Sequence, residues 1–217
     1  MGEKSKVCFF VTSVIEPQTT QPFTYGCRSI YTSKERRIQT INTVKSIRLY
    51  MPDASIVFVE GGGIYDSEIA NQVSKYIYLG GNFFVKKAVN NKCKAWGEIV
   101  LTLIGCFYWI KYAYVFKISG RYQLTNKFNR SKWIDDKITG LDIYGDNTQI
   151  STRLVGIPRQ YYYTFLKAIL RRIWRIPNSN CVYEAYILKG IGLKNINFIS
   201  PIGIYGKIGN SVDEINE

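Results

Sequence analysis

Short, continuous runs of β-branched and aromatic residues alternate along this chain with helix-forming segments, and this alternation limits the fold more than any other feature. Residues 6–13 and 55–60 are two such runs, and residues 75–79 and 114–118 are two more. A strand in which apolar residues do not alternate with polar ones is usually buried on both faces, as in a parallel sheet. The pattern predicts an α/β protein with a mostly parallel or mixed central sheet flanked by helices.

The segment between the first two runs has the pattern of an amphipathic helix. Thr32 and Glu35 form a capping box, in which each side chain satisfies an amide at the start of the helix. Apolar residues then recur at every third position, and Pro52 ends the helix. The opening of the chain therefore predicts one βαβ unit. The apolar positions are Ile38, Ile41, Val44 and Ile47.

Residues 99–118 are almost wholly apolar, so a membrane span has to be considered. Lys111 interrupts the stretch, and a charged residue inside a span is costly. The composition also changes from helix-forming residues before Lys111 to strand-forming residues after it. We expect a buried helix over residues 94–111, followed by a buried strand.

The second half of the chain is less regular. We expect a strand at residues 149–153, a basic amphipathic helix at residues 159–176, a further helix at residues 182–189 and a glycine-punctuated, β-like end. A chain of 217 residues is long enough for one sizeable domain and short for two. Residues 1–217 are therefore predicted to form a single domain.

The composition excludes several classes of enzyme. Histidine is absent, which removes Ser-His-Asp and Cys-His nucleophiles and HExxH zinc sites. Acid–base chemistry must then come from carboxylates, tyrosines or lysines. The five cysteines are odd in number and contain no CxxC, which favours a reducing compartment. Because the N-terminus is short and polar, we expect no signal peptide there, and we expect a cytoplasmic protein.

Polar residues follow three of the predicted strands. Ligands of open α/β sheets bind at the carboxyl ends of the strands. Thr12 and Ser13 end the first strand, Glu60 ends the second, and residues 119–121 (Ser-Gly-Arg) follow the strand that ends at Ile118. A glycine there lets the backbone approach a ligand while Arg121 points a cation at it. A plain turn with a solvated arginine is the alternative, and the GxGxxG and GxxxxGK[ST] fingerprints are both missing.

The basic helix predicted at residues 159–176 indicates possible binding partners. Lys and Arg number 29 against 16 Asp and Glu, a net charge of +13. The helix at residues 159–176 combines cations with an apolar side, which suits peripheral contact with the anionic inner face of a membrane. A core-packing helix with a basic outer face is the alternative. Nucleic acid is a less favoured partner, because no nucleic-acid-binding motif is present. The cations are Arg159, Lys167, Arg171, Arg172 and Arg175.

Five short motifs, taken in order, resemble those of small GT-A glycosyltransferases, found in surface-polysaccharide clusters of bacteria and in large DNA viruses. The resemblance covers most of the chain, and it implies a GT-A-like (Rossmann-like) fold. It also implies transfer of a sugar from a nucleotide-diphosphate sugar to a glycan, a glycoprotein glycan or a lipid-linked acceptor. The motifs lie at residues 35–48 with 51–60, 94–98, 116–124, 151–154 with 182–184, and the glycine-rich 202–206.

The resemblance assigns roles to individual residues. Arg121 would meet the diphosphate leaving group, and Glu184, in an apolar helix, would take the proton of the acceptor hydroxyl. Eight further residues are expected to bind the nucleotide sugar. They are Thr12, Ser13, Arg36, Glu60, Lys94, Ser119, Gly120 and Arg153.

The chain departs from the GT-A pattern at the metal site. An Asp-x-Asp normally follows the strand ending at Ile118, and this sequence has none, with Arg121 near the expected place. We expect transfer without a required cofactor, because an arginine binds phosphate oxygens through charge-assisted bonds. A Mn²⁺ or Mg²⁺ ion held by the adjacent Asp135 and Asp136 is the alternative.

Two other functions fit the same sequence. One is a non-enzymatic basic module that binds RNA or an anionic membrane, whose binding would follow salt and ignore nucleotide identity. The other is a relative that keeps the fold and binds glycans without catalysis. The polar and charged residues at the strand ends favour the enzyme over both.

Overall fold

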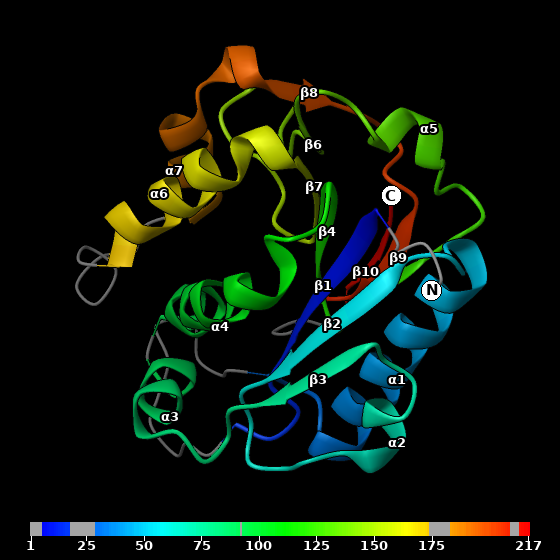
Figure 1. The fold of residues 1–217 in the computed structure, drawn as a ribbon, viewed down its shortest axis with the longest axis vertical. Helices are drawn as coiled ribbons and strands as arrows, with labels where there is room; N and C mark the ends of the chain where they lie inside the picture. The colour runs from blue at the N-terminus through cyan, green and yellow to red at the C-terminus, as the bar shows by residue number, and fades with distance from the viewer. Residues whose placement is uncertain (1–5, 18–28, 92, 174–182, 209–212) are drawn as a thin grey trace.

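The computed structural model describes residues 6–17, 29–91, 93–173, 183–208 and 213–217. They form three layers, with a twisted sheet between two groups of helices (Figure 1). Helices α3, α4, α6 and α7 cover one face of the sheet, and α1 and α2 lie on the other. The helices are α1 (Ser33–Tyr50), α2 (Ser67–Ala70), α3 (Phe83–Val89), α4 (Lys94–Trp109), α5 (Arg130–Trp133), α6 (Tyr162–Ile173) and α7 (Tyr183–Ile191).

The central sheet is mostly parallel. Its strand order is β3-β2-β1-β4-β7-β6-β8, and β7 runs against the other strands. A second sheet has the order β10-β9-β5 and is antiparallel. The strands are β1 (Val7–Ser13), β2 (Ser55–Glu60), β3 (Lys75–Tyr78), β4 (Tyr114–Ser119), β5 (Tyr122–Leu124), β6 (Ile138–Gly140), β7 (Leu154–Pro158), β8 (Ile196–Phe198), β9 (Ile204–Lys207) and β10 (Glu214–Asn216).

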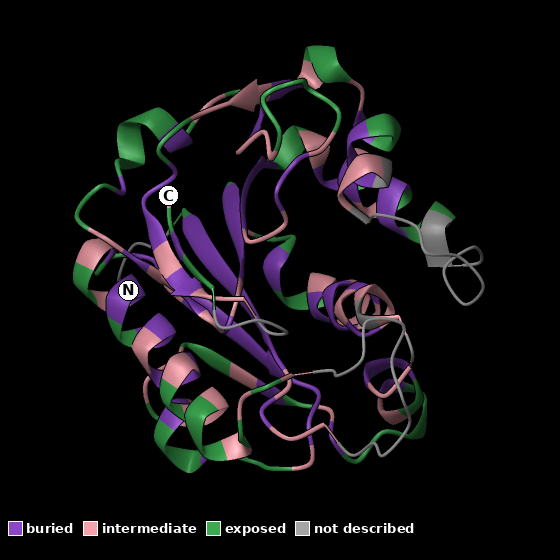
Figure 2. Ribbon diagram, turned by 180° about the vertical axis from the view of Figure 1, so that it is seen from behind, coloured by how far each residue is buried: buried purple, intermediate pink, exposed green. Residues whose placement is uncertain are grey.

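Strand β1 lies in the middle of the sheet, and every residue of it is buried. Successive side chains enter opposite faces, as the period of two in a strand requires. Phe9 stacks on Phe116 in the core beneath α1, with ring centroids 4.7 Å apart. Phe10 meets Trp109 of α4 in the other core, at 5.9 Å. Figure 2 shows the buried sheet between the more exposed helices.

The small sheet attaches to α1 next to the end of β4. The hydroxyl of Ser46 on α1 accepts a hydrogen bond from the amide of Leu124 on β5, at 2.9 Å. Strand β5 follows β4 after a two-residue turn, so this bond also fixes the direction in which the chain leaves the central sheet.

The structure confirms most of the predicted elements in the first half of the chain. The helix expected at residues 94–111 is α4, which ends at Trp109, and β4 follows it. No helix among the described residues has the length and apolar character that crossing a membrane requires. Ile38, expected on the buried stripe of α1, is instead 47% exposed.

The predictions for the second half need correction. The strand expected at residues 149–153 is β7, which begins only at Leu154, because the preceding residues form a turn with a single bridge at Ile150. The basic helix is α6, preceded by a 3₁₀ turn, and residues 174–176 lie outside the described residues. The helix expected at residues 182–189 is α7.

The capping box predicted at the start of α1 is present. The amide of Glu35 donates to Thr32 Oγ1 at 3.3 Å, and the Glu35 carboxylate accepts from the Thr32 amide at 2.8 Å. This exchange satisfies two of the amides that the first turn leaves without helical partners. Arg36 directly follows Glu35, so the cap also fixes the position of the Arg36 backbone.

Replacing Thr32 with alanine is expected to lower the free energy of unfolding by about 1 kcal/mol, because the cap acceptor is lost. Thr32→Ser keeps the hydroxyl and should stay close to the wild type. Urea unfolding followed by circular dichroism measures both variants. An equal loss in the serine variant would contradict the role of the hydroxyl.

Candidate active site

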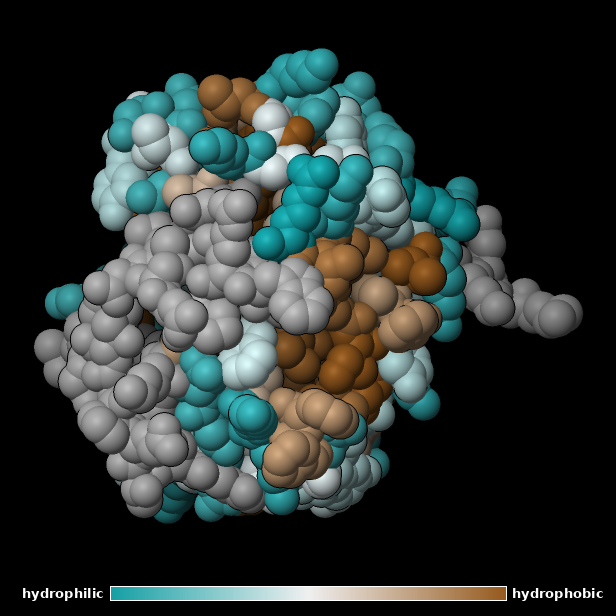
Figure 3. All heavy atoms as spheres, turned by 90° about the vertical axis from the view of Figure 1, so that its left-hand side faces the viewer, coloured by the Kyte–Doolittle hydropathy of each residue, from teal (hydrophilic) through white to brown (hydrophobic). Residues whose placement is uncertain are grey.

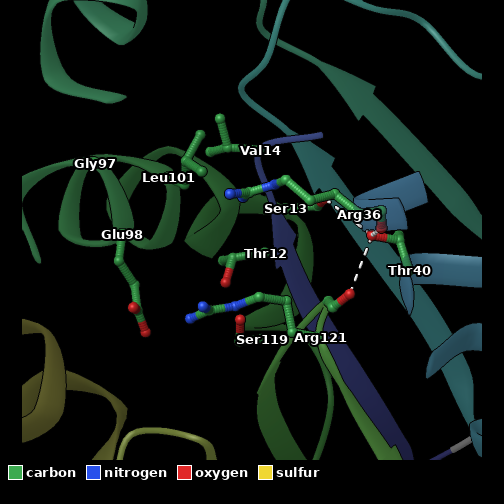
Figure 4. Close-up of a pocket in the computed structure, with 11 residues that line it drawn as sticks. Thr12, Ser13, Val14, Arg36, Thr40, Gly97, Glu98, Leu101, Ser119 and Arg121 are labelled. Atoms are coloured by element: carbon green, nitrogen blue, oxygen red, sulfur yellow. Dashed lines mark hydrogen bonds between the residues drawn. The ribbon is translucent and has the colours of Figure 1, made fainter. Parts of the chain in front are cut away.

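A pocket opens where β1 and β4 end, at the edge predicted from the sequence. Its hollow measures about 660 Å³ when the open mouth is counted. Side chains from β1, α1, α4 and the turn after β4 line it (Figure 4). The lining residues are Thr12, Ser13, Val14, Arg36, Thr40, Gly97, Glu98, Leu101, Ser119, Gly120 and Arg121.

The turn after β4 is held rigidly against β1 and α1. The Gly120 amide donates to the carbonyl of Thr12 at 2.9 Å, and the Gly120 carbonyl accepts from Thr40 Oγ1 at 3.0 Å. A Cβ atom on Gly120 would lie 3.2 Å from Thr40 Oγ1 and 3.3 Å from the Cβ of Ser13, so a side chain would crowd both neighbours. The glycine thus lets three elements meet at the pocket, and it fixes the position of Arg121.

Two arginines enter the pocket from different elements. Arg36 comes from the first turns of α1, and Arg121 from the turn after β4. Figure 4 shows their guanidinium groups extending in the same direction on either side of Thr12, towards α4. Two cations facing one cavity favour an anionic ligand with more than one charged group.

A buried ion pair stands at the wall opposite the arginines. Lys117 lies on β4 with its side chain 3% exposed, and its ammonium contacts the carboxylate of Glu98 on α4. The same ammonium donates to the carbonyl of Thr152 at 2.9 Å, and Thr152 Oγ1 donates to the carboxylate of Glu184 at 3.0 Å. Lys117 therefore links Glu98 in the pocket wall directly to Thr152, which precedes β7, and through Thr152 to Glu184 on α7.

Burial lowers the pKa of the Lys117 ammonium to about 7. The negative charge of Glu184 raises this pKa, and the positive charge of Arg121 lowers it. Any anion that binds between Arg121 and Lys117 would favour the charged form of the lysine.

Glu60 lies behind the pocket and joins two loops. Its Oε1 accepts hydrogen bonds from the amides of Ile15, at 2.9 Å, and Gly62, at 2.6 Å. Burial raises the pKa of this carboxyl to about 7, although both amides, the Ser13 hydroxyl and the charge of Arg36 lower it. Glu60 does not line the pocket; it holds the chain after β1 against the chain after β2.

The other predicted binding residues differ in position. Arg153 directs its side chain to the carboxylate of Glu217, with Nη1 2.5 Å from Oε1. Its carbonyl accepts from the Ser119 amide at 3.3 Å, so its backbone adjoins the pocket turn. Lys94 is the first residue of α4, and its side chain lies outside the described part of the structure.

Asp135 and Asp136, the alternative metal ligands, lie far from the pocket. They precede β6, which pairs with β7 beside the start of β4, whereas the pocket is at the end of β4. Asp135 instead accepts a hydrogen bond from Asn197 at 2.7 Å. The described residues hold no group of three Cys, Asp or Glu side chains close enough to bind a metal together.

Sequence reasoning missed Glu98 and Lys117 as site residues. A lysine within the otherwise apolar strand at residues 114–118 was a usable signal, since a buried cation needs an acidic partner. The partner is not predictable from the sequence, because Glu98 lies 19 positions before Lys117 and only the packing of α4 against the sheet brings the two side chains together.

The raised pKa of Glu60 makes a prediction about folding stability. The carboxyl binds a proton more tightly in the folded state than at its ordinary pKa of 4.5, so stability falls as pH rises from about 4.5 to about 7. Glu60→Gln keeps an acceptor for both amides and removes the titration. Near pH 5 the variant should match the wild type, and near pH 8 it should be more stable by up to about 3 kcal/mol. Urea unfolding at the two pH values tests this, and a pH-independent difference would contradict it.

No protein-family model matches the sequence, and no curated protein matches it. Solved structures match in fold. The WbbM bifunctional glycosyltransferase has a TM-score of 0.54 at 9% identity, over 91% of this chain and 39% of that chain. A double cysteine-to-serine mutant of a transferase has a TM-score of 0.52 at 12% identity, over 94% of both chains. The glycosyltransferase GlyE of Streptococcus pneumoniae TIGR4 has a TM-score of 0.51 at 9% identity, over 91% of this chain and 46% of that one.

The chain thus spans less than half the length of WbbM and of GlyE, and covers nearly all of the mutant transferase. At these identities the likeness establishes the architecture. The central sheet with its flanking helices has a GT-A-like fold.

Proposed function

We propose that the protein is a nucleotide-sugar-dependent glycosyltransferase, which moves a hexose or related sugar to a glycan or glycoconjugate acceptor. The observation that carries the proposal is the position of Arg36 and Arg121. Both guanidinium groups enter one pocket at the carboxyl ends of β1 and β4, where open α/β sheets bind their ligands. The GT-A-like fold supports the same assignment.

The two arginines suit the diphosphate of the donor. When the bond between the anomeric carbon and the diphosphate oxygen breaks, the leaving group gains negative charge. Arginine stays protonated at any working pH and binds phosphate oxygens in a fixed fork of donors. Arg36 and Arg121 thus stabilise the charge that develops during transfer. Thr12, Ser13 and Ser119 add hydroxyls around it.

The acidic wall of the pocket suits the acceptor. The acceptor hydroxyl oxygen forms the new bond to the anomeric carbon, the diphosphate leaves with the electron pair of the old bond, and the hydroxyl proton must go to a base. Glu98 lines the pocket and is our candidate for that base. Glu184, the base favoured by the sequence, reaches Glu98 only indirectly: it accepts from Thr152 Oγ1, and the Thr152 carbonyl accepts from the Lys117 ammonium that contacts Glu98. Its negative charge raises the pKa of Lys117.

A divalent metal does not fit the described residues of this pocket well. A metal on a diphosphate takes carboxylate oxygens. The acidic residue in the described lining is Glu98, and Lys117 contacts its Oε1, which leaves a metal one carboxylate oxygen. We therefore assign the neutralisation of the diphosphate to the arginines and derive no step through a metal.

The proposed reaction suits three classes of acceptor. A surface polysaccharide, a glycoprotein glycan or a lipid-linked sugar each presents the hydroxyl that the reaction needs. A non-enzymatic RNA- or membrane-binding module gains no support from the fold, and it leaves the two arginines in the pocket without a role.

Arg121→Ala and Arg36→Ala are each expected to weaken nucleoside-diphosphate binding by about 10- to 100-fold, because a charge-assisted bond to phosphate is lost. Arg37→Ala is the matched control. Its side chain points to Asp66 and Glu68, with Nε 2.5 Å from Asp66 Oδ2, and does not line the pocket. Calorimetric titration of UDP, GDP, CMP and dTDP, with and without Mn²⁺, identifies the nucleotide. Binding that needs Mn²⁺ and survives both arginine changes would refute the assignment.

Glu98→Gln is expected to lower kcat by about 10²- to 10⁴-fold, with the KM of the donor little changed, because the base is removed and the arginines remain. Glu184→Gln should cause a smaller loss. The assay measures release of nucleoside diphosphate once the donor is known from the titrations. A larger loss in the Glu184 variant would return the role of base to Glu184.

A further inference from the structure

Helices α3 and α4 present large apolar side chains to solvent. Phe107 is 76% exposed, Phe84 75% and Phe83 71%, and Tyr108 and Ile110 are also exposed. Isolated exposed apolar residues are ordinary, whereas several on two helices in contact often mark an interaction site. We call Phe83, Phe84, Phe107, Tyr108 and Ile110 the α3–α4 surface. Figure 3 shows hydrophobic atoms gathered over this side of the molecule.

The exposure of these side chains is not a failure of packing. Helix α3 already buries Val85, Ala88 and Val89 in the core. The rings of Phe83 and Phe84 lie on its other side and contact each other, with centroids 5.8 Å apart. Helix α3 is therefore apolar on two faces, of which the fold uses only one.

Positive charge surrounds the α3–α4 surface. Between Glu68 and Asp135 the sequence has one acidic residue, Glu98, which faces the pocket and contacts Lys117. Lys86 and Lys87 follow the phenylalanines on α3, and Lys111 follows α4. Helix α6, packed against α4, adds the exposed Lys167, Arg171 and Leu170 and contains no acid.

We propose that the α3–α4 surface docks on an anionic membrane. Phenylalanines would enter the boundary between headgroups and acyl chains while the surrounding lysines and arginines meet anionic headgroups. A second copy of the chain is a poorer occupant, because a two-fold interface would place the same basic rim against itself. Nucleic acid would suit the cations and leave the phenylalanines exposed.

The surface shares α4 with the candidate active site. Gly97, Glu98 and Leu101 line the pocket from the first half of this helix, and Phe107 and Tyr108 lie in its second half. If the proposed transferase function holds, docking through α4 would keep the pocket next to a lipid-linked acceptor. The docking itself needs no nucleotide and is tested without one.

The test is co-sedimentation of the full chain with vesicles of equal parts phosphatidylcholine and phosphatidylglycerol, against vesicles of phosphatidylcholine alone. The wild type should bind the anionic vesicles preferentially. Phe83→Ser with Phe84→Ser, and separately Lys86→Glu with Lys87→Glu, should each weaken binding at least about tenfold. Circular dichroism checks that both double variants fold.

Two control variants lie on α1, across the sheet. Leu49 is 71% exposed there, so Leu49→Ser removes an equally exposed apolar side chain. Lys34→Glu with Lys45→Glu changes the net charge as much as the lysine pair on α3. Both controls should keep vesicle binding close to that of the wild type.

Three results would overturn the proposal. The first is equal binding to both kinds of vesicle. The second is an equal loss in the α1 controls, which would mean that net charge alone drives binding. The third is no vesicle binding together with a dimer that Phe83→Ser/Phe84→Ser dissociates, which would make the surface a self-association interface. Nucleotide titration of the same variants reports separately on the transferase function.

Discussion

The pairing of β1 with β2 on one side and β4 on the other is the constraint on which the rest of this structure depends. Strand β1 is buried over its whole length, and its two faces supply the centre of both cores. Its carbonyl at Thr12 then receives the Gly120 amide, which places the turn carrying Arg121 beside the end of β1. The pocket is thus a consequence of where the central parallel strands stop.

Helix α4 belongs at once to the core, to the pocket and to the outer surface of the molecule. Its inner face packs on β1 through Trp109, its first turns line the pocket, and its last turn carries exposed aromatic rings. Glu98 has two roles, because its carboxylate neutralises the buried Lys117 and also faces the cavity. A change in α4 would therefore affect stability, the pocket and the outer surface together.

The sequence predicted those features whose signal is local. Continuous apolar runs identified β1, β2 and β4, and the Thr32–Glu35 spacing identified the start of α1. The strand-end rule found the pocket residues Thr12, Ser13, Ser119, Gly120 and Arg121. Strand β7 was placed too early, because a short antiparallel strand depends on pairing with β4 rather than on its own pattern. The role of Glu60 also depends on a distant partner, the amide of Ile15.

By itself, the sequence determined the α/β class, the positions of the central strands, the absence of imidazole chemistry and the excess of positive charge. These follow from residue type and from periodicities of a few residues. The tertiary structure decided that Arg36 and Arg121 share one cavity, that Lys117 meets Glu98, and that Arg153 turns to Glu217 instead. Such contacts join residues far apart in the chain, and they exist only because packing of the two cores brings their elements together.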